Sequence, residues 1–202
     1  IKSDNSPLTE ADVCAHGLIM SRVRLLTPEV PILSEESDLI SWKEREKWKE
    51  YWLIDPLDGT KEFISHNGEF TVNVALIKNH EPILGVVYAP SLEQTWIGEK
   101  GKPAQKITKG KTENIQVNLH KKGEKWKVVG SRSHAGDSLQ QYLKKLGNYQ
   151  FIPMGSSIKL CLVAEGKAHI YPRLGLTSEW DTAAAHAVVN AAGGQVVRYG
   201  TN

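Results

Sequence analysis

Hydrophobic and polar positions along this chain follow two periods, which together predict a mixture of helices and strands. From Val13 to Leu26 apolar residues recur at helical spacing, and Thr9 precedes them as an N-cap with Asp12 at the capping-box position. Further helices are predicted over 37–50, 139–146, 158–164 and 182–192, the first of them charged and exposed. Strands are predicted over 31–34, 51–54, 70–77, 83–88, 95–97, 127–130, 168–171 and 195–199.

The order of the predicted elements changes near the middle of the chain. The first half has the pattern of antiparallel sheet with helix, including a hairpin that turns at 79–82, whereas the second half alternates strand and helix. This order predicts an α+β part followed by an α/β part, with two layers of sheet sandwiched by helices. The stretch 98–114, rich in Lys, Gly and Thr, is predicted to be a mobile loop. Because the chain begins at Ile1 and stops soon after an apolar run, both ends are expected to be incomplete.

Composition narrows the class of protein without identifying it. The chain has 202 residues, 40% of them hydrophobic and 24% charged, which is ordinary for a soluble globular protein. With 25 basic and 23 acidic residues the net charge is +2, which argues against wrapping of nucleic acid, and no stretch has the length of a membrane span. Cys14 and Cys161 lack metal-binding spacing, which predicts two reduced, mostly buried thiols in a reducing compartment.

The segment WLIDPLDGTKEF, at 52–63, ends an apolar strand on two carboxylates. We expect Asp55 and Asp58 to share one tight turn, stiffened by Pro56, because proline fixes its own φ angle. The carbonyl of Leu57 can point into the same space. Oxygen ligands of this kind are the ones that Mg²⁺ prefers.

Two further acids can reach this turn from other parts of the chain. Glu35 ends a short strand, and Asp181 lies at the start of a distant helix. Four carboxylates would repel one another without cations, whereas two divalent ions can clamp the attacking and leaving oxygens of a phosphoryl group. A helix that begins at Gly59 and Thr60 would offer free amides to a phosphate. The Thr60 hydroxyl could then orient a water, with Asp12 as its partner.

Each of these acids also has an ordinary structural explanation. An isolated pair such as Asp55 and Asp58 is most often a turn or cap. Asp181 fits the N-cap of its Ala-rich helix, and Asp12 fits a first-turn acid favoured by the helix dipole. The acids at 35–36 fit a solvated loop. Spacing by itself therefore leaves metal binding and a purely structural role both open.

Three motifs together resemble the signature of the inositol monophosphatase superfamily of lithium-sensitive, Mg²⁺-dependent phosphatases: LSEE at 33–36, DPLDGTKEF at 55–63 and WDTAAAHAVVNAAGG at 180–194. Within it, nearly the whole chain is similar to the CysQ-type 3′(2′),5′-bisphosphate nucleotidases. The resemblance implies a layered α-β-α-β-α sandwich, combining α/β and α+β parts in one catalytic unit. Its N-terminal subdomain, 1–122, would carry most metal ligands, and 123–202 would form the C-terminal subdomain. Ala185 departs from the family, which usually has Gly there.

The resemblance also implies a role for each candidate residue. It implies two or three Mg²⁺ ions and a catalytic pair, Asp12 and Thr60, that acts on the attacking water. The amides of Gly59 and Thr60 would hold the phosphate that is removed. The implied metal ligands are Glu35, Asp55, Leu57, Asp58 and Asp181. Leu57 would act through its carbonyl, and Leu57, Asp58 and Asp181 would also face the substrate.

The second phosphate and the nucleoside need contacts of their own. The resemblance points to His134 in SRSH, Ser156 and Lys159 in GSSIK, and Arg173 in YPR. His, Lys and Arg suit a phosphate. Lys159 also fits a solvated helix residue, Arg173 a surface ion pair and His134 a loop cap.

The implied reaction is hydrolysis of the 3′-phosphate of 3′-phosphoadenosine 5′-phosphate to AMP and phosphate, in sulfur assimilation or nucleotide recycling. The expected partner is this small nucleotide, not nucleic acid, and the protein is expected to be a monomer or homodimer. We expect a cytoplasmic location, with peripheral contact at the inner membrane left open. An inositol monophosphatase and a non-catalytic Mg²⁺-binding scaffold remain alternatives. The first needs no second phosphate site, and the second needs no water-activating pair.

Overall fold

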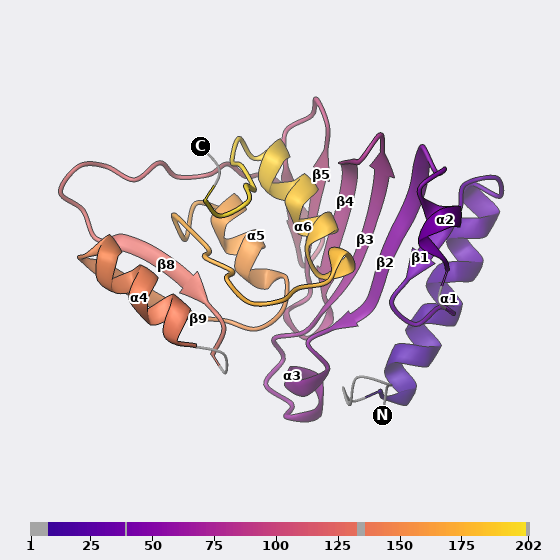
Figure 1. Cartoon of the computed structure of the whole chain (residues 1–202), viewed down its shortest axis with the longest axis horizontal. Coiled ribbons are helices and arrows are strands. Elements are labelled where there is room, and N and C mark those ends of the chain that lie inside the picture. The colour runs from indigo at the N-terminus through magenta and orange to yellow at the C-terminus, as the bar shows by residue number, and fades with distance from the viewer. Residues whose placement is uncertain (1–7, 39, 133–135, 201–202) are drawn as a thin grey trace.

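The computed structural model describes residues 8–38, 40–132 and 136–200, which form two β-sheets with helices packed on both sides of each (Figure 1). The helices are α1 (Glu10–Leu26), α2 (Trp42–Arg45), α3 (Thr60–Ile64), the 3-10 helix η1 (Pro90–Leu92), α4 (Asp137–Leu146), α5 (Ile158–Ala164) and α6 (Glu179–Ala191). The strands are β1 (Ile32–Ser34), β2 (Glu50–Asp58), β3 (Thr71–Lys78), β4 (Glu81–Ala89), β5 (Gln94–Glu99), β6 (Gln105–Thr108), β7 (Lys111–Asn114), β8 (Trp126–Gly130) and β9 (Tyr149–Pro153).

The large sheet contains β1 to β7 in chain order, with β1 parallel to β2 and every other neighbouring pair antiparallel. Because side chains alternate between the two faces of a strand, successive residues of β2 pack in different layers. Leu53 and its partner Ala75 belong to the core cluster that contains α6. Ile54 and its partner Val74 pack instead with Met20 and its neighbours on α1. Helices therefore cover both faces of the large sheet.

Helix α6 lies unusually close to the large sheet. A Cβ atom on Gly85 would stand 2.1 Å from the carbonyl oxygen of Ala184, and one on Gly98 would stand 2.4 Å from Cα of Val188. Glycine on the strands and alanine on the helix therefore make this approach possible. Ala185 of α6 is fully buried in the same core.

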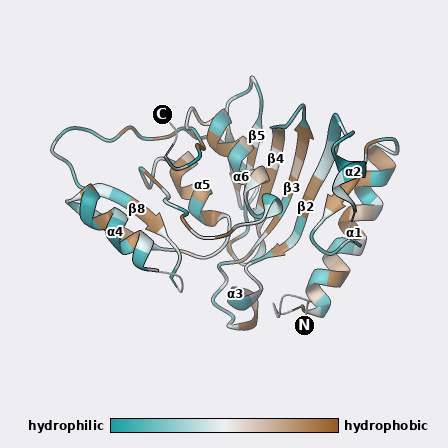
Figure 2. Cartoon of the chain, viewed as in Figure 1, coloured by the Kyte–Doolittle hydropathy of each residue, from teal (hydrophilic) through white to brown (hydrophobic). Residues whose placement is uncertain are grey.

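The small sheet pairs β8 with β9 in parallel, and it completes the layered arrangement. On one face, Val128 of β8 packs against Leu139 and Leu143 of α4. On the other side lie α5 and α6, which contact each other and lie between the two sheets (Figure 1). The strands under α6 are mainly apolar, whereas α4 is mainly hydrophilic with a few apolar positions (Figure 2). The predicted α-β-α-β-α sandwich is confirmed.

The predicted subdomain boundary at 122–123 falls in the connection between the two sheets, after β7 and before β8. The C-terminal helix α6 nevertheless packs on the large sheet of the first part. The division into two subdomains stays a prediction. Within the described ranges, no helix is both long enough and apolar enough to cross a membrane.

Several predicted elements are confirmed. Thr9 caps α1 in a capping box with Asp12. The hairpin of β3 and β4, the strand β5, the strand β8 and the helices α4, α5 and α6 lie where the pattern predicts them, within a few residues. At the start of α6 the N-cap is Ser178 and Asp181 is at N3 of the capping box, so the alternative of Asp181 as N-cap is wrong.

The predicted mobile loop at 98–114 is wrong, because β6 and β7 extend the large sheet there. The buried position of β6 is occupied by a lysine, so the sequence of β6 lacks the alternation of apolar and polar residues that predicts a strand. Lys106 is only 4% exposed, lies over the ring of Trp96, and donates to Glu165 at 2.9 Å. A charged side chain can be buried when it is paired in this way.

Four smaller predictions are also wrong, and one strand was not predicted. The predicted helix over 37–50 is reduced to α2, because β2 already begins at Glu50. The strand predicted over 168–171 is only an isolated bridge from Ile170 to Val128, and 195–199 is mostly exposed and forms no strand. The pattern missed β9, whose side chains are half-buried or exposed without apolar alternation. Both thiols are free, but Cys14 is exposed and only Cys161 is buried.

Candidate active site

The two acids of the DPLD segment lie on strand β2, not on a tight turn as the sequence predicts. Asp55 pairs with Asn73 and Asp58 pairs with Thr71, so β2 carries one more residue than β3 between these pairs. Pro56 cannot donate a hydrogen bond to a neighbouring strand, which suits it to such a bulge. The bulge lets two acids close in sequence lie at the same end of the sheet.

The structure brings four predicted metal ligands together. Glu35 follows β1 and its amide donates to the carbonyl of Ile54 at 3.0 Å, which holds Glu35 beside β2. Asp55 is 1% exposed, and burial together with the charges of Asp58, Glu35 and Asp181 raises its pKa well above the usual value. Burial and the charge of Asp58 also raise the pKa of Asp181 to about 6. The carboxylates of Glu35, Asp55, Asp58 and Asp181 therefore lie close enough for their charges to interact, and we call these four residues the acid cluster.

The acid cluster has the chemistry of a cation site. Oδ2 of Asp55 is buried, and no described residue donates a hydrogen bond to it. Hard cations bind carboxylate oxygens of this kind, and such oxygens are costly to leave unpaired. Among the residues that the structure describes, however, no three His, Cys, Asp or Glu side chains have the geometry of a formed metal site. The donor set fits a divalent cation, and the individual ligands stay a prediction.

Asp58 is held by side chains that the sequence analysis missed. Its Oδ2 accepts hydrogen bonds from the amide of Ser157 at 2.6 Å and from the Ser157 hydroxyl at 2.7 Å. Asn73 donates to the same hydroxyl at 2.8 Å, and both Asn73 and Thr71 lie 3.4 Å from Oδ2. Thr71 and Asn73 occupy buried positions of the FTVNVALI strand. Polar residues at inward positions are the signal that would have found them.

The predicted catalytic pair is not hydrogen-bonded in this structure. Asp12 is fully buried, and its Oδ2 accepts from the amide and hydroxyl of Thr9 at 2.8 and 2.5 Å. Thr60 begins α3 after Gly59, which has a left-handed φ of 92°, and its hydroxyl lies 3.5 Å from the carbonyl of Leu57. The action of Asp12 and Thr60 on a water therefore stays a prediction.

A cavity of about 140 Å³ adjoins the acid cluster. It brings together six of the predicted site residues from segments far apart in the chain. They are Asp58, Gly59, Ser156, Lys159, Arg173 and Asp181. His134 lies outside the described residues.

Two cationic side chains line this cavity. Lys159 is 8% exposed and lies 5.6 Å from the ring centre of Tyr171. Burial lowers the pKa of Lys159, while the charge of Asp58 opposes this effect. Arg173 is exposed, and its guanidinium is oriented by Thr177 at 2.5 Å and by the carbonyl of Leu176 at 2.7 Å. A cavity lined by both acids and cations can bind a metal and an anion side by side.

The fold and this site define a class of protein. The inositol monophosphatase family matches residues 1–202, and the chain belongs to this family.

Individual relatives narrow the comparison. The 3′(2′),5′-bisphosphate nucleotidase CysQ of Escherichia coli (strain K12) is 55% identical over 195 residues, which cover 96% of this chain and 77% of that protein. CysQ of Buchnera aphidicola is 45% identical, with 96% of this chain and 72% of that protein covered. The crystal structure of CysQ from Bacteroides thetaiotaomicron matches with a TM-score of 0.88 at 41% identity, and covers 99% of this chain and 79% of that one.

Proposed function

We propose that this protein is a Mg²⁺-dependent 3′(2′),5′-bisphosphate nucleotidase. It removes the 3′-phosphate of 3′-phosphoadenosine 5′-phosphate and yields AMP and phosphate. The observation that carries the proposal is the adjacency of the acid cluster around Asp55 and Asp58 to a cavity with two cations, Lys159 and Arg173. The identity of 55% to a CysQ protein supports the choice of substrate.

The acid cluster would hold the metal. We assign two or three Mg²⁺ ions to the carboxylates of Glu35, Asp55, Asp58 and Asp181 and to the carbonyl of Leu57. When bound, Mg²⁺ supplies a more acidic water and neutralises charge on the phosphoryl oxygens.

The remaining residues of the reaction hold a phosphate and move a proton. The Thr60 hydroxyl orients the attacking water, and Asp12 accepts a proton through it, for which the unpaired Oδ1 of Asp12 is available. The amides of Gly59 and Thr60 hold the 3′-phosphate. Catalysis on this scheme is mostly positioning and neutralisation of charge.

The cavity wall would bind the rest of the nucleotide. Lys159 is buried, and burial lowers its pKa although the charges of Asp58 and Glu62 oppose this effect, so an anionic ligand would offset the cost of burying its charge. Arg173 and Ser156 reach the same cavity. We assign the 5′-phosphate and the nucleoside to these three residues together with His134.

The cellular setting is part of the proposal. The substrate is a small nucleotide, and the near-neutral charge of +2 gives no support for a nucleic-acid partner. The two free cysteines fit the reducing cytoplasm. A monomer or homodimer, and contact with the cytoplasmic face of the inner membrane, stay predictions.

The test compares phosphate release from 3′-phosphoadenosine 5′-phosphate and from inositol 1-phosphate, with Mg²⁺ and then with EDTA. We expect strong preference for the nucleotide, no release in EDTA, and loss of Mg²⁺-dependent turnover in Asp55→Asn. Lys159→Ala should raise KM for the nucleotide by about tenfold or more, the loss that one charged hydrogen bond gives. Lys100→Ala, on an exposed ion pair with Glu81, is the matched control.

Three results would contradict the proposal. Preference for inositol 1-phosphate, with KM unchanged in Lys159→Ala, would identify an inositol monophosphatase. Undiminished turnover in Asp55→Asn would remove the acid cluster from the reaction. Bound Mg²⁺ without release from either substrate would indicate a scaffold.

A further inference from the structure

The segment that carries Ser156 and Ser157 into the cavity has a demanding conformation. Ser156 has a φ of 46°, in the left-handed region that a residue with a Cβ atom rarely adopts. Gly155 before it is so close to α3 and the connection that follows it that a Cβ atom would stand 2.7 Å from the carbonyl oxygen of Glu69 and 2.8 Å from Cγ of Glu62. A strained segment persists only where its surroundings hold it.

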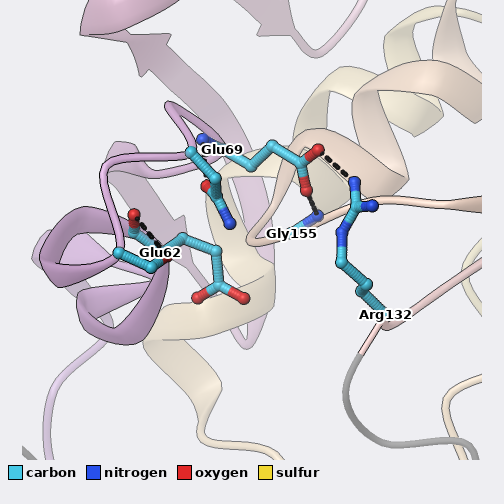
Figure 3. Close-up of polar contacts among 6 residues, drawn as sticks. Glu62, Glu69, Arg132 and Gly155 are labelled. Atoms are coloured by element: carbon cyan, nitrogen blue, oxygen red, sulfur yellow. Dashed lines mark hydrogen bonds and ion pairs between the residues drawn. The ribbon is translucent and has the colours of Figure 1, made fainter.

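One carboxylate holds this segment from outside the cavity. Oε2 of Glu69 accepts a hydrogen bond from the amide of Gly155 at 2.7 Å, and Oε1 pairs with Nη2 of Arg132 at 2.6 Å (Figure 3). The Glu69 side chain is 16% exposed. Its own backbone is fixed by a hydrogen bond from its amide to Oδ1 of Asn67 at 2.9 Å.

Each of the two partners of Glu69 is adjacent in sequence to a residue that lines the cavity. Arg132 follows Ser131, which lines the cavity just after β8, and Gly155 precedes Ser156, which lines it just after β9. Glu69 itself lies just before β3 of the large sheet. The carboxylate therefore ties both exits of the small sheet to the segment that enters β3 of the large sheet.

We propose that Glu69 is a positioning residue that fixes the substrate-binding wall of the cavity. It acts through Gly155 and Arg132, which hold Ser156, Ser157 and Ser131 in place, and it does not touch the reacting atoms. The inference rests on the proposed function only in the identity of the ligand. Charge-assisted hydrogen bonds are the strong ones, so a carboxylate with two of them suits this task.

The experiment compares Glu69→Ala, Glu69→Gln and Arg132→Ala with the control Glu81→Ala, which removes an exposed ion pair with Lys100. Amide hydrogen exchange at 155–157 is measured first, because it needs no substrate. KM and kcat for 3′-phosphoadenosine 5′-phosphate are measured next.

In Glu69→Ala we expect faster exchange at 155–157 and a rise in KM of about 10- to 100-fold, the range for a lost charged hydrogen bond. We expect kcat to fall by a smaller factor than KM rises, because Asp58 keeps its contacts with Thr71 and Asn73 even where the Ser157 segment loosens. Glu69→Gln keeps an acceptor for the Gly155 amide, and it serves if the alanine variant does not fold. The rise in KM in Glu69→Gln should be smaller than that in Glu69→Ala. Glu81→Ala should match the parent protein in hydrogen exchange, KM and kcat.

Unchanged exchange at 155–157 in both Glu69 variants would overturn the inference whatever the kinetics. An equal fall in kcat and rise in KM, or no change in either, would also overturn it. Failure of the parent protein to hydrolyse the nucleotide would instead overturn the proposed function, and hydrogen exchange would still decide whether Glu69 fixes the segment.

Discussion

Ser157→Ala is predicted to destabilise the protein well beyond the usual effect of removing a hydroxyl. The Ser157 side chain is 3% exposed and its Oγ lies 2.7 Å from Oδ2 of Asp58, 2.7 Å from the carbonyl of Asp181 and 2.8 Å from Nδ2 of Asn73. One hydroxyl thus joins β2, β3, α5 and α6 at the site.

The magnitude follows from the groups left behind. Loss of a hydrogen bond to a charged carboxylate costs about 1.5–3 kcal/mol, and a buried donor such as Nδ2 of Asn73 left without its partner costs about 1–3 kcal/mol. The Ser157 amide still donates to Asp58, and Nδ2 keeps a long contact of 3.4 Å to the same oxygen. We therefore expect a loss of about 3–5 kcal/mol in the free energy of unfolding. For a chain of this length that lowers Tm by about 6–20 °C.

Urea denaturation in EDTA, followed by tryptophan fluorescence, measures this loss without any contribution from bound metal. Ser21→Ala is the matched control, because the Ser21 hydroxyl makes an exposed bond to the Leu18 carbonyl in α1. The control should change the free energy of unfolding by less than about 0.5 kcal/mol. A loss below about 1 kcal/mol in Ser157→Ala would show that the hydroxyl does not join these elements, contrary to this prediction.

Three further predictions concern packing, charge and metal. Gly85→Ala should destabilise by about 3 kcal/mol or more, because its Cβ would overlap the Ala184 carbonyl, whereas Gly17→Ala, with open space in α1, should stabilise by about 0.5–1 kcal/mol; urea denaturation compares them. Burial opposes ionisation of Glu165, but hydrogen bonds from Lys167, Lys106 and Trp96 prevail and lower its pKa. Its stabilisation is therefore complete above the unfolded pKa of 4.5 and lost as pH falls through the folded value, so the stability deficit of Glu165→Gln should shrink from pH 7 to pH 4; a constant deficit would contradict this. Saturating Mg²⁺ should raise Tm by about 5–10 °C over EDTA in differential scanning fluorimetry, and this shift should disappear in Asp55→Asn.

Local patterns in the sequence predict those elements whose shape is decided by neighbours along the chain. The capping box of Thr9 and Asp12 lies within one helical turn, and Gly147 is the C-cap of α4, directly after the predicted helix 139–146. The strand β6 could not be predicted in the same way. Its buried Lys106 is stabilised by Glu165, a residue 59 positions away, so its polarity gives no local sign of burial.

The same distinction between local and distant contacts applies to the residues of the candidate site. The acids Asp55 and Asp58 stand together in a motif, so the sequence predicts their shared location, although not the bulged strand that provides it. Ser157 and Glu69 act on residues 99 and 86 positions away, and nothing near either of them marks the partner. Residues that hold a site in place from a distance need the fold before they can be recognised.

Because these contacts join residues far apart in the sequence, they also determine when the site can form during synthesis of the chain. During synthesis at about 5–20 residues per second, the 99 residues from the one after Asp58 to Ser157 itself take about 5–20 seconds to emerge. Throughout that interval the acids of β2 must remain hydrated, because the segments that enclose them have not been made. A nascent chain therefore cannot bind a ligand in this cavity until α5 and α6 have packed into place. Protection of the chain by a ligand would begin only at the last step of folding.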